Sequence, residues 1–461
     1  MASSRSSTPA DRACARVRRA VAAWIASLPP GDKPIAFALS GGRDSMTLLD
    51  AGAEALAAAG RRSIAFHVHH GLQADADRWV EACSRACAER GVAFAMRRAC
   101  VALGPRASLE ARARDARYLA LRSLAREHGA THIALAHHQD DQAETVLLQL
   151  GRGAGPAGLA AMPRTARDAD GLTWHRPFLA LPRADIDAFA SAQRLDFVLD
   201  PSNADVRLRR NAVRAHLAPV FAATLPGYPD TLARAATHQA EAAALMDALA
   251  AIDARAAAFD RASGTIDAAA FATLDAPRAR NLLRWFLRRH GLPGPPAARL
   301  DTMLRQLAHA RRDAAVEIRH AGAIVGRHRG RVIVHAPPPA DYQRPWRGEV
   351  SVALPHGELA FRPTAGAGVD PRHVGAGLTI RPRRGGERMR LGPAGARRAL
   401  KDLLREADLP PWERDALPLV VAGDALVAVP GLGVDIAWRT PPGTQGLVPV
   451  WRCAPEEPAP R

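Results

Sequence analysis

A glycine-rich hexapeptide carries the clearest chemistry in this sequence. Residues 40–45 read Ser-Gly-Gly-Arg-Asp-Ser and follow the short apolar run at 35–39. A glycine turn at the start of a helix lets backbone N–H groups wrap a phosphate. The Gly-Lys-Ser/Thr of a Walker A loop is missing. We therefore expect a nucleotide phosphate here, and a glycine turn with a Ser/Asp helix cap is the structural alternative.

A second polar group, at 137–145, reads His-His-Gln-Asp-Asp-Gln-Ala-Glu-Thr. Asp140 and Glu144 are four residues apart and Asp141 and Glu144 are three apart, so on a helix they can share one face. Close carboxylates can hold Mg²⁺ on a triphosphate or receive a cationic amine. The structural alternative is an Asp-x-x-Glu helix cap. The two histidines with Asp141 also have a spacing that zinc could use, but no further ligand is apparent.

Elements of alternating type must position these groups. The pattern predicts strands at 35–39, 63–70, 92–99 and 131–136, and helices at 46–60, 75–90, 108–128 and 142–150. Strands that alternate with helices of this length predict a doubly wound parallel α/β sheet, Rossmann-like in type.

The rest of the chain changes character. We predict a disordered N-terminus at 1–20, a catalytic α/β domain at 21–225, a helical domain at 226–336, a proline-rich linker at 337–348 and a C-terminal α+β domain at 349–455. Two β-like segments close the helical domain, and one helix is expected at 395–409 in the last domain.

Charge points to a polyanionic partner. The formal net charge is +17, and Lys33 and Lys401 are the only lysines, so arginine supplies nearly all of it. Nucleic acid is the usual partner of such a surface. An anionic membrane surface is the rival, but no basic amphipathic helix stands out. No run approaches ~18 apolar residues, so we expect no transmembrane helix.

The five cysteines match no disulfide framework, and Cys83 and Cys87 have no second pair with which to bind zinc. We expect reduced thiols and a cytoplasmic protein.

Several segments then resemble known enzymes. Residues 40–45 resemble the SGGxDS loop of the PP-loop ATP-pyrophosphatase superfamily. Longer stretches, HVHHGLQADADRW, EARARDARY (110–118), AHHQDDQAETVLLQLGRGAGPAGLAAM, RPFLALPRADIDAFA, DPSNADVRLRRNAVR and the C-terminal IRPRRGGERMRLGPAGARRALKDLLREADL, are similar to the tRNA(Ile)-lysidine synthetase family. The resemblance covers nearly the whole chain. It departs at His69, where Asp or Asn is common, and at Gln73, where Arg is common.

The resemblance implies a two-step reaction. The C2 oxygen of the wobble cytidine, position 34 of the isoleucine tRNA with a CAU anticodon, attacks the α-phosphate of ATP and releases pyrophosphate. The amine of free lysine then attacks C2, and AMP leaves. The product, lysidine, changes the codon read from AUG to AUA. The implied cofactors are ATP and Mg²⁺, the partners are tRNA and lysine without a membrane, and a homodimer is left open.

The resemblance also implies residue roles. ATP contacts fall to Ser40, Gly41, Gly42, Arg43, Asp44, Ser45 and His70. Catalytic roles fall to Asp44, Arg112, Asp140, Asp141 and Glu144, of which Asp44, Asp140 and Asp141 are the Mg²⁺ candidates. Contacts with tRNA fall to Arg117, Asn203, Arg210, Asn211, Arg214, Arg383, Arg384 and Arg388. A solvated helix face is the alternative for Arg112 and Arg117, and loop bracing for the group at 203–214.

Three rival functions remain at this point. A PP-loop tRNA thiolase would need a reactive cysteine or a Cys-x-x-Cys site. An amidotransferase or synthetase acting on a small metabolite would not explain the charge. A tRNA-binding module without catalysis would not explain the two polar groups at 40–45 and 137–145.

Overall fold

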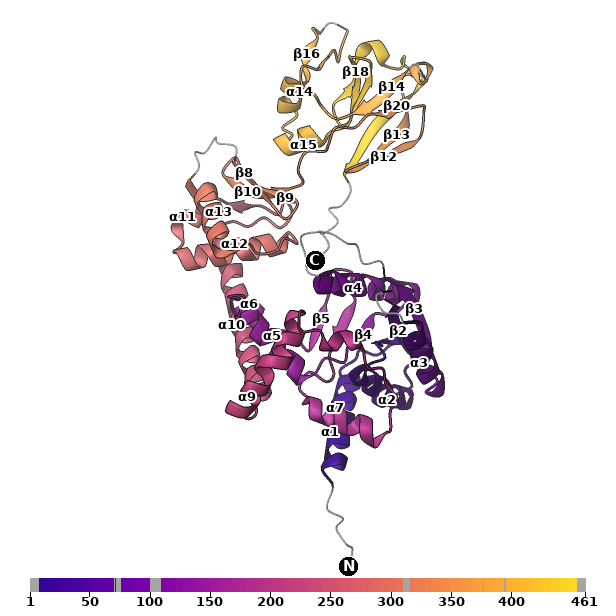
Figure 1. The fold of residues 1–461 in the computed structure, drawn as a ribbon. Coiled ribbons are helices and arrows are strands. Elements are labelled where there is room, and N and C mark those ends of the chain that lie inside the picture. The colour runs from indigo at the N-terminus through magenta and orange to yellow at the C-terminus, as the bar shows by residue number, and fades with distance from the viewer. Residues whose placement is uncertain are drawn as a thin grey trace, which may run out of the picture. The chain divides into compact units, whose positions relative to one another are not determined.

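The computed structural model describes residues 8–69, 71, 76–99, 109–309, 316–375, 377–393 and 395–453. The chain forms two compact units, Met1–Met246 and Asp247–Arg461 (Figure 1). His70 and Gln73 lie outside the described residues.

The first unit is built on a six-stranded sheet. Its strands are β1 (Ile35–Ala38), β2 (Ser63–His69), β3 (Ala93–Arg98), β4 (His132–Ala134), β5 (Thr165–Arg167) and β6 (Thr173–His175). Their order is β3-β2-β1-β4-β6-β5. All neighbours are parallel except β5, which pairs antiparallel with β6. The predicted doubly wound parallel sheet is confirmed.

The helices of this unit alternate with the strands. They are α1 (Pro9–Ala26), α2 (Arg43–Ala58), α3 (Ala76–Glu89), α4 (Leu109–Glu127), α5 (Gln139–Leu150), α6 (Pro156–Leu159), α7 (Arg183–Ala192), α8 (Arg209–Ala212) and α9 (Ala218–Thr224). Two short segments, the 3-10 helix η1 (Pro201–Ala204) and the π-helix η2 (Val213–Leu217), flank α8. The long helix α10 (Tyr228–Ala256) then leads into the second unit.

The two faces of the sheet bury different side chains, as the period of two in a strand requires. Phe37 of β1 packs with α1, α2, α3 and α7 on one face, and Phe66 of β2 packs with α4 on the other. Figure 1 shows α1, α2 and α7 lying together. Gly52 permits the close contact of α2 with the sheet, because a Cβ there would lie 2.6 Å from the Phe37 ring. Both faces are thus covered, which leaves the strand ends for function.

The prediction of a disordered N-terminus is wrong for residues 9–20. They lie in α1, which begins at a capping box formed by Thr8 and Asp11. Val17, Val21 and Trp24 of this helix are buried in the core. The Arg- and Ser-rich composition of the segment masked an apolar stripe at helical spacing, and burial of that stripe stabilises the helix.

The second unit begins with helices around a small sheet. Its elements are β7 (Ile266–Asp267), α11 (Ala270–Thr273), α12 (Ala276–Arg289), α13 (Ala297–His309), β8 (Val316–His320), β9 (Ala323–His328) and β10 (Arg331–His335). The strand order is β7-β10-β9-β8, so the sheet has more strands than the two segments predicted. Phe286 and Leu287 of α12 and Val332 of β10 belong to its core.

The remaining elements form the C-terminal α+β part. They are β11 (Arg344–Pro345), β12 (Ser351–Leu354), β13 (Gly357–Ala365), η3 (Pro371–His373), β14 (Leu378–Arg381), β15 (Arg388–Met389), β16 (Arg398–Ala399), α14 (Leu400–Glu406), α15 (Pro411–Ala416), β17 (Leu419–Ala422), β18 (Ala425–Val429), β19 (Gly433–Val434), η4 (Ile436–Trp438) and β20 (Gln445–Cys453). The helix predicted at 395–409 starts later, at Leu400, because Arg398–Ala399 pairs with β15 as a strand. Among the described helices, none is both long and apolar enough to cross a membrane.

Candidate active site

The glycine-rich loop joins the carboxyl end of β1 to α2. Gly41 has a φ of +84°, which favours glycine, and Gly42 is the N-cap of α2. The Oγ of Ser45 donates to the Gly42 carbonyl at 2.9 Å and accepts from the Ser40 N–H at 3.2 Å. The loop is therefore held in a curve by its own serines, with backbone at a helix N-terminus, where a phosphate binds well.

Cys83 of α3 lies directly beneath this loop. A Cβ on Gly41 would be 3.1 Å from the Cys83 Sγ and 3.7 Å from a methyl group of Val198. The Val198 N–H also donates to the Gly41 carbonyl at 2.9 Å. Side chains of Cys83 and Val198 therefore pack against the loop, and a backbone hydrogen bond fixes its conformation.

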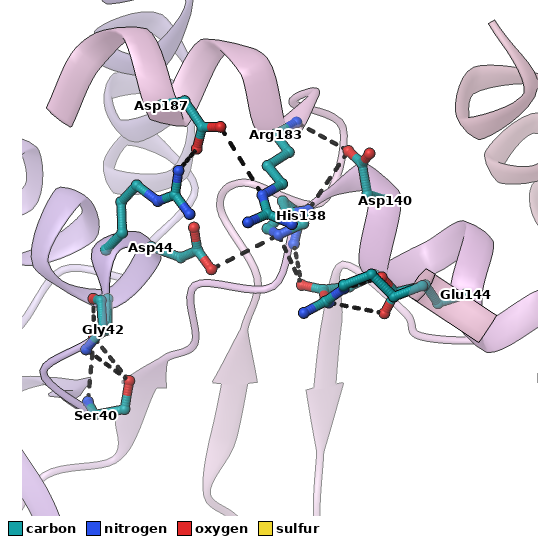
Figure 2. Close-up of polar contacts among 12 residues, drawn as sticks. Ser40, Gly42, Asp44, His138, Asp140, Glu144, Arg183 and Asp187 are labelled. Carbon is teal, nitrogen blue, oxygen red and sulfur yellow. Dashed lines mark hydrogen bonds and ion pairs between the residues drawn. The ribbon is translucent and has the colours of Figure 1, made fainter. Parts of the chain in front are cut away.

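His138 is the point where the loop meets the acidic helix. It is the N-cap of α5 and is 2% exposed. Its Nε2 lies 3.7 Å from the Asp44 Oδ2 and 3.5 Å from the Asp141 Oδ2, and its Nδ1 lies 3.7 Å from the Asp140 Oδ2 (Figure 2). Burial alone would lower the pKa of His138, but the three carboxylates together raise it above its ordinary value. His138 thus joins two groups that are far apart in sequence.

Asp44 faces this cluster from the first turn of α2. Burial raises the pKa of its carboxyl, and the nearby His138 opposes that rise. Its Oδ1 is buried and has no hydrogen-bond partner among the described residues. Asp44 therefore keeps an unused acceptor in the site. By contrast, the Oδ2 of Asp140 already accepts a hydrogen bond from the Arg183 N–H at 2.9 Å and so caps α7.

Glu144 forms ion pairs with two arginines. It is 5% exposed, and its Oε2 accepts from the Arg210 Nε at 2.8 Å. Its Oε1 accepts from the Arg214 Nε at 2.7 Å. The Arg210 Nη2 also donates to the Asp141 Oδ1 at 3.0 Å. Arg214 lies in the π-helix η2, a conformation that is frequent at functional sites.

Three further residues with predicted roles, Arg43, Arg117 and Asn211, each contact another residue of the first unit. Arg43 pairs with Asp187 of α7. Arg117 is partly buried on α4 beside Tyr118. Asn211 donates to the backbone carbonyls of Ser202 and Asp205, which braces the loop.

The arginines predicted near the C-terminus lie in the second unit. Arg383 is 3.6 Å from Asp415 and Arg384 is 3.1 Å from Asp341, while Arg388 donates to a backbone carbonyl at 2.7 Å. Arg112, on α4, has its Nε buried. For Asn203 the side chain, like His70 as a whole, lies outside what the structure describes.

Sequence reasoning missed the central histidine and three arginines. His138 was considered only for zinc, although it immediately precedes the predicted helix, where an N-cap falls. The spacing E-x-x-x-R from Glu110 leads to Arg114 rather than to Arg112. Arg176 directly follows β6 and Arg183 is the first residue of α7, and no local pattern distinguishes them.

Protein side chains alone form no metal site in the part of the chain that the structure describes. No set of three or more His, Cys, Asp or Glu side chains there is arranged to hold a metal ion. Mg²⁺, in contrast, is commonly held by one or two carboxylates together with substrate phosphates and water. Asp44, with its free Oδ1, and Asp140 fit that second manner of binding.

The parallel sheet and the phosphate loop at the end of β1 define a PP-loop, ATP-using enzyme, and a model of the PP-loop domain matches residues 15–221. Models of the TilS substrate binding domain and the TilS substrate C-terminal domain match residues 266–333 and 378–451. The chain belongs to the tRNA(Ile)-lysidine synthase family.

Two relatives show the extent of this similarity. The tRNA(Ile)-lysidine synthase of Ralstonia nicotianae is 45% identical and aligns with 94% of this chain and 98% of its own length. That of Burkholderia mallei is 42% identical over 88% of this chain and 90% of its own length. A solved U34-tRNA thiolase from Methanococcus maripaludis overlaps with a TM-score of 0.44 at 17% identity, covering 50% of this chain and 80% of its own. That similarity is too low to transfer an activity.

Proposed function

We propose that the chain joins free lysine to C2 of the wobble cytidine, position 34, of an isoleucine tRNA with a CAU anticodon. The observation that carries the proposal is the cluster around His138, where Asp44 of the phosphate loop and the carboxylates of α5 lie within 4 Å of one imidazole. Such a cluster unites a nucleotide site with an acidic site suited to an amine. Membership of the family supplies the tRNA substrate.

The first step is adenylation. The cytidine O2 attacks the α-phosphorus of ATP, an O–P bond forms, and pyrophosphate leaves with the electrons of the broken P–O bond. Ser40, Gly41, Gly42, Arg43 and Ser45 would hold the phosphates, and His70 would complete the ATP contacts. Asp44, with Asp140 or Asp141, would hold Mg²⁺, which when bound neutralises charge on the departing pyrophosphate.

The second step is displacement of AMP. The ε-ammonium of lysine has an ordinary pKa of about 10.4, so it must lose a proton before its nitrogen attacks C2. The C2–N bond forms, and the former O2 leaves as part of AMP. Asp140, Asp141 and Glu144 are the proposed acidic contacts of the amine. Arg112 is proposed to stabilise the reacting phosphate.

Recognition of tRNA would use residues beyond the catalytic cluster. We propose Arg117, Asn203, Arg210, Asn211 and Arg214 near the site, and Arg383, Arg384 and Arg388 in a C-terminal domain at 349–455. A helical substrate domain at 226–336 and a linker at 337–348 would connect the two. A cytoplasmic location follows from the same substrate, and a homodimer is compatible with it.

The buried thiols favour this reaction over sulfur transfer. Cys83 and Cys87 are fully buried, and burial raises their pKa values to about 12 and about 11. Sulfur chemistry needs an accessible thiolate. Neither thiol meets that need, and Cys100 lies outside the described residues.

The decisive experiment measures whether lysine is incorporated into the RNA. The full chain is incubated with ATP, Mg²⁺, radiolabelled lysine and the unmodified tRNA transcript, and label in the RNA is counted. We expect ATP-dependent incorporation with release of AMP and pyrophosphate. Label from a sulfur donor, with none from lysine, would overturn the proposal.

A further inference from the structure

Three arginines gather around one tyrosine beside the candidate active site. The guanidinium carbons of Arg114 and Arg117, both on α4, lie 5.5 and 5.7 Å from the centre of the Tyr118 ring. Arg176 follows β6, is 7% exposed, and donates its Nη1 to the Pro163 carbonyl at 2.8 Å. It also lies close enough to Tyr118 to lower the pKa of the tyrosine hydroxyl. We refer to Arg114, Arg117 and Arg176 as the arginine cluster.

The charge of the arginine cluster is not balanced by the protein. Within the described residues, none of the three forms an ion pair with a carboxylate, whereas the neighbouring Arg210 and Arg214 are paired with Glu144. The Nε atoms of Arg117 and Arg176 are buried there without a hydrogen-bond partner, and the buried Tyr118 hydroxyl lies beside the two guanidiniums. Arg176 is buried and Arg117 is partly buried, whereas Arg114 is exposed. Burial of an unpaired charge is costly, so a compensating anion is expected beside Arg117 and Arg176.

The surrounding groups are tuned by the same excess of positive charge. Burial would raise the pKa of Tyr118, but Arg114, Arg117 and Arg176 bring it below its ordinary value. Burial lowers the pKa of Arg117 and of Arg176. Tyr118 opposes this lowering and no carboxylate does, so within the described residues the cluster lacks a carboxylate of its own.

Sheet order places the arginine cluster at some distance from the phosphate loop. Arg176 follows the carboxyl end of β6, the loop follows β1, and β4 lies between them. Adjacent strands are about 4.8 Å apart, so the two positions are separated by roughly 10 Å. The pyrophosphate part of ATP is expected at the phosphate loop, so it does not account for a phosphate at the cluster. The substrate that attacks ATP is the better source of that phosphate.

We propose that the arginine cluster is a phosphate-binding site that receives a backbone phosphodiester of the RNA substrate next to the reacting nucleotide. A guanidinium fork binds phosphate oxygens in a bidentate manner, and Tyr118 supplies a further donor. The proposal rests on the proposed function only in taking RNA as the substrate. A phosphate of ATP has the same chemistry, and the experiment separates the two sources.

The test uses the full chain with Arg117→Gln and Arg176→Gln. Arg122→Gln is the matched control, because Arg122 lies on the same helix and over the Trp174 ring but pairs with Asp168 at 3.0 Å. Binding of an unmodified CAU tRNA transcript is measured across a salt series without ATP. Binding of α,β-methylene ATP is measured without RNA, and thermal unfolding is followed without either.

We expect each cluster variant to weaken RNA binding about tenfold and to lower the salt slope by about one unit. The affinity for the ATP analogue and the RNA affinity of the control should not change. The Tm of the free Arg117→Gln protein should stay the same or rise, because an unpaired buried charge has been removed.

Two results would count against the proposal. Weaker binding of the ATP analogue with unchanged RNA binding would overturn the RNA assignment and give the site to ATP. A lower Tm with both affinities unchanged would make the cluster structural. These readouts are binding constants, so they stand even if lysine incorporation, the test of the proposed function, fails.

Discussion

Asp44 is the single residue on which the proposed adenylation depends most directly. We expect Asp44→Ala to abolish pyrophosphate release while tRNA binding stays nearly intact, because Asp44 belongs to the cluster around His138 and the proposed tRNA contacts are other residues. Pyrophosphate release and a gel shift with tRNA measure the two properties separately.

Asp50→Ala is the matched control for that variant. Asp50 lies on the same helix α2 but pairs with Arg90 at 2.8 Å. Its loss should leave pyrophosphate release close to the wild-type rate. Normal pyrophosphate release with lost tRNA binding in Asp44→Ala would contradict the role given to Asp44.

His175 makes stability depend on pH at the residue scale. It is buried, its Nε2 lies 2.9 Å from the His132 Nδ1, and burial, His132 and Arg176 lower its pKa from 6.5 to about 4. The unfolded chain therefore binds the proton more readily between these values. The stabilisation, about 3 kcal/mol at most, is present above pH 6.5 and is lost as the pH falls toward 4.

We expect wild-type protein to lose more unfolding free energy than His175→Gln between pH 7 and pH 5. Urea denaturation at both pH values measures this difference. An identical loss in the two proteins would show that His175 titrates normally in the folded state.

At the scale of elements, Gly41 couples the phosphate loop to the helix α3 beneath it. Gly41→Ala should place its Cβ 3.1 Å from the Cys83 Sγ and force alanine to a φ of +84°, a strain of about 1–2 kcal/mol. Because small displacements of a phosphate site slow the reaction strongly, we expect kcat/KM for ATP to fall about tenfold or more.

Gly60→Ala separates backbone strain from the shape of the loop. Gly60 has a φ of +67°, and nothing lies within 4 Å of its added Cβ. It should lower Tm by a similar strain but leave kcat/KM for ATP unchanged. If both substitutions lowered kcat/KM equally, the contact between Gly41 and Cys83 would not explain the loss of activity.

Local patterns predicted the elements that carry the chemistry. The apolar run before Ser40 and the helix after His138 are both read from short windows of sequence, and the structure has them. The partners of Glu144 could not be read in this way. Arg210 and Arg214 lie 66 and 70 residues further on, and only the folded chain brings them to α5. Strand β16 was missed for a different reason: β15 and β16 have two residues each, too few for the alternating pattern of a strand to be recognised.

At the scale of the whole molecule, arginines outside the first unit should contribute to tRNA binding. Replacement of Arg383, Arg384 and Arg388 by Ala should weaken binding without changing ATP chemistry. Each lost phosphate contact should lower the salt slope by about one unit, equally for cognate and other tRNAs. Arg388 should contribute most, because Arg383 and Arg384 already face carboxylates.

Binding of the triple variant is measured across a salt series beside Arg372→Ala. Arg372 lies in the same unit and is paired with Asp370. Its removal should leave the slope unchanged. An unchanged slope and affinity in the triple variant would leave those arginines as solvated surface.

The arginine-rich composition has a consequence for the selectivity of the second step. In the proposed mechanism, the adenylated cytidine is an electrophile that any nearby free amine could attack. Both lysines are exposed, and neither belongs to the cluster around His138. The side chains that pair with Asp141 and Glu144 are the guanidiniums of Arg210 and Arg214, which stay protonated and are not nucleophilic at neutral pH. Under the proposed mechanism, arginines can surround the activated cytidine with positive charge without being modified by it.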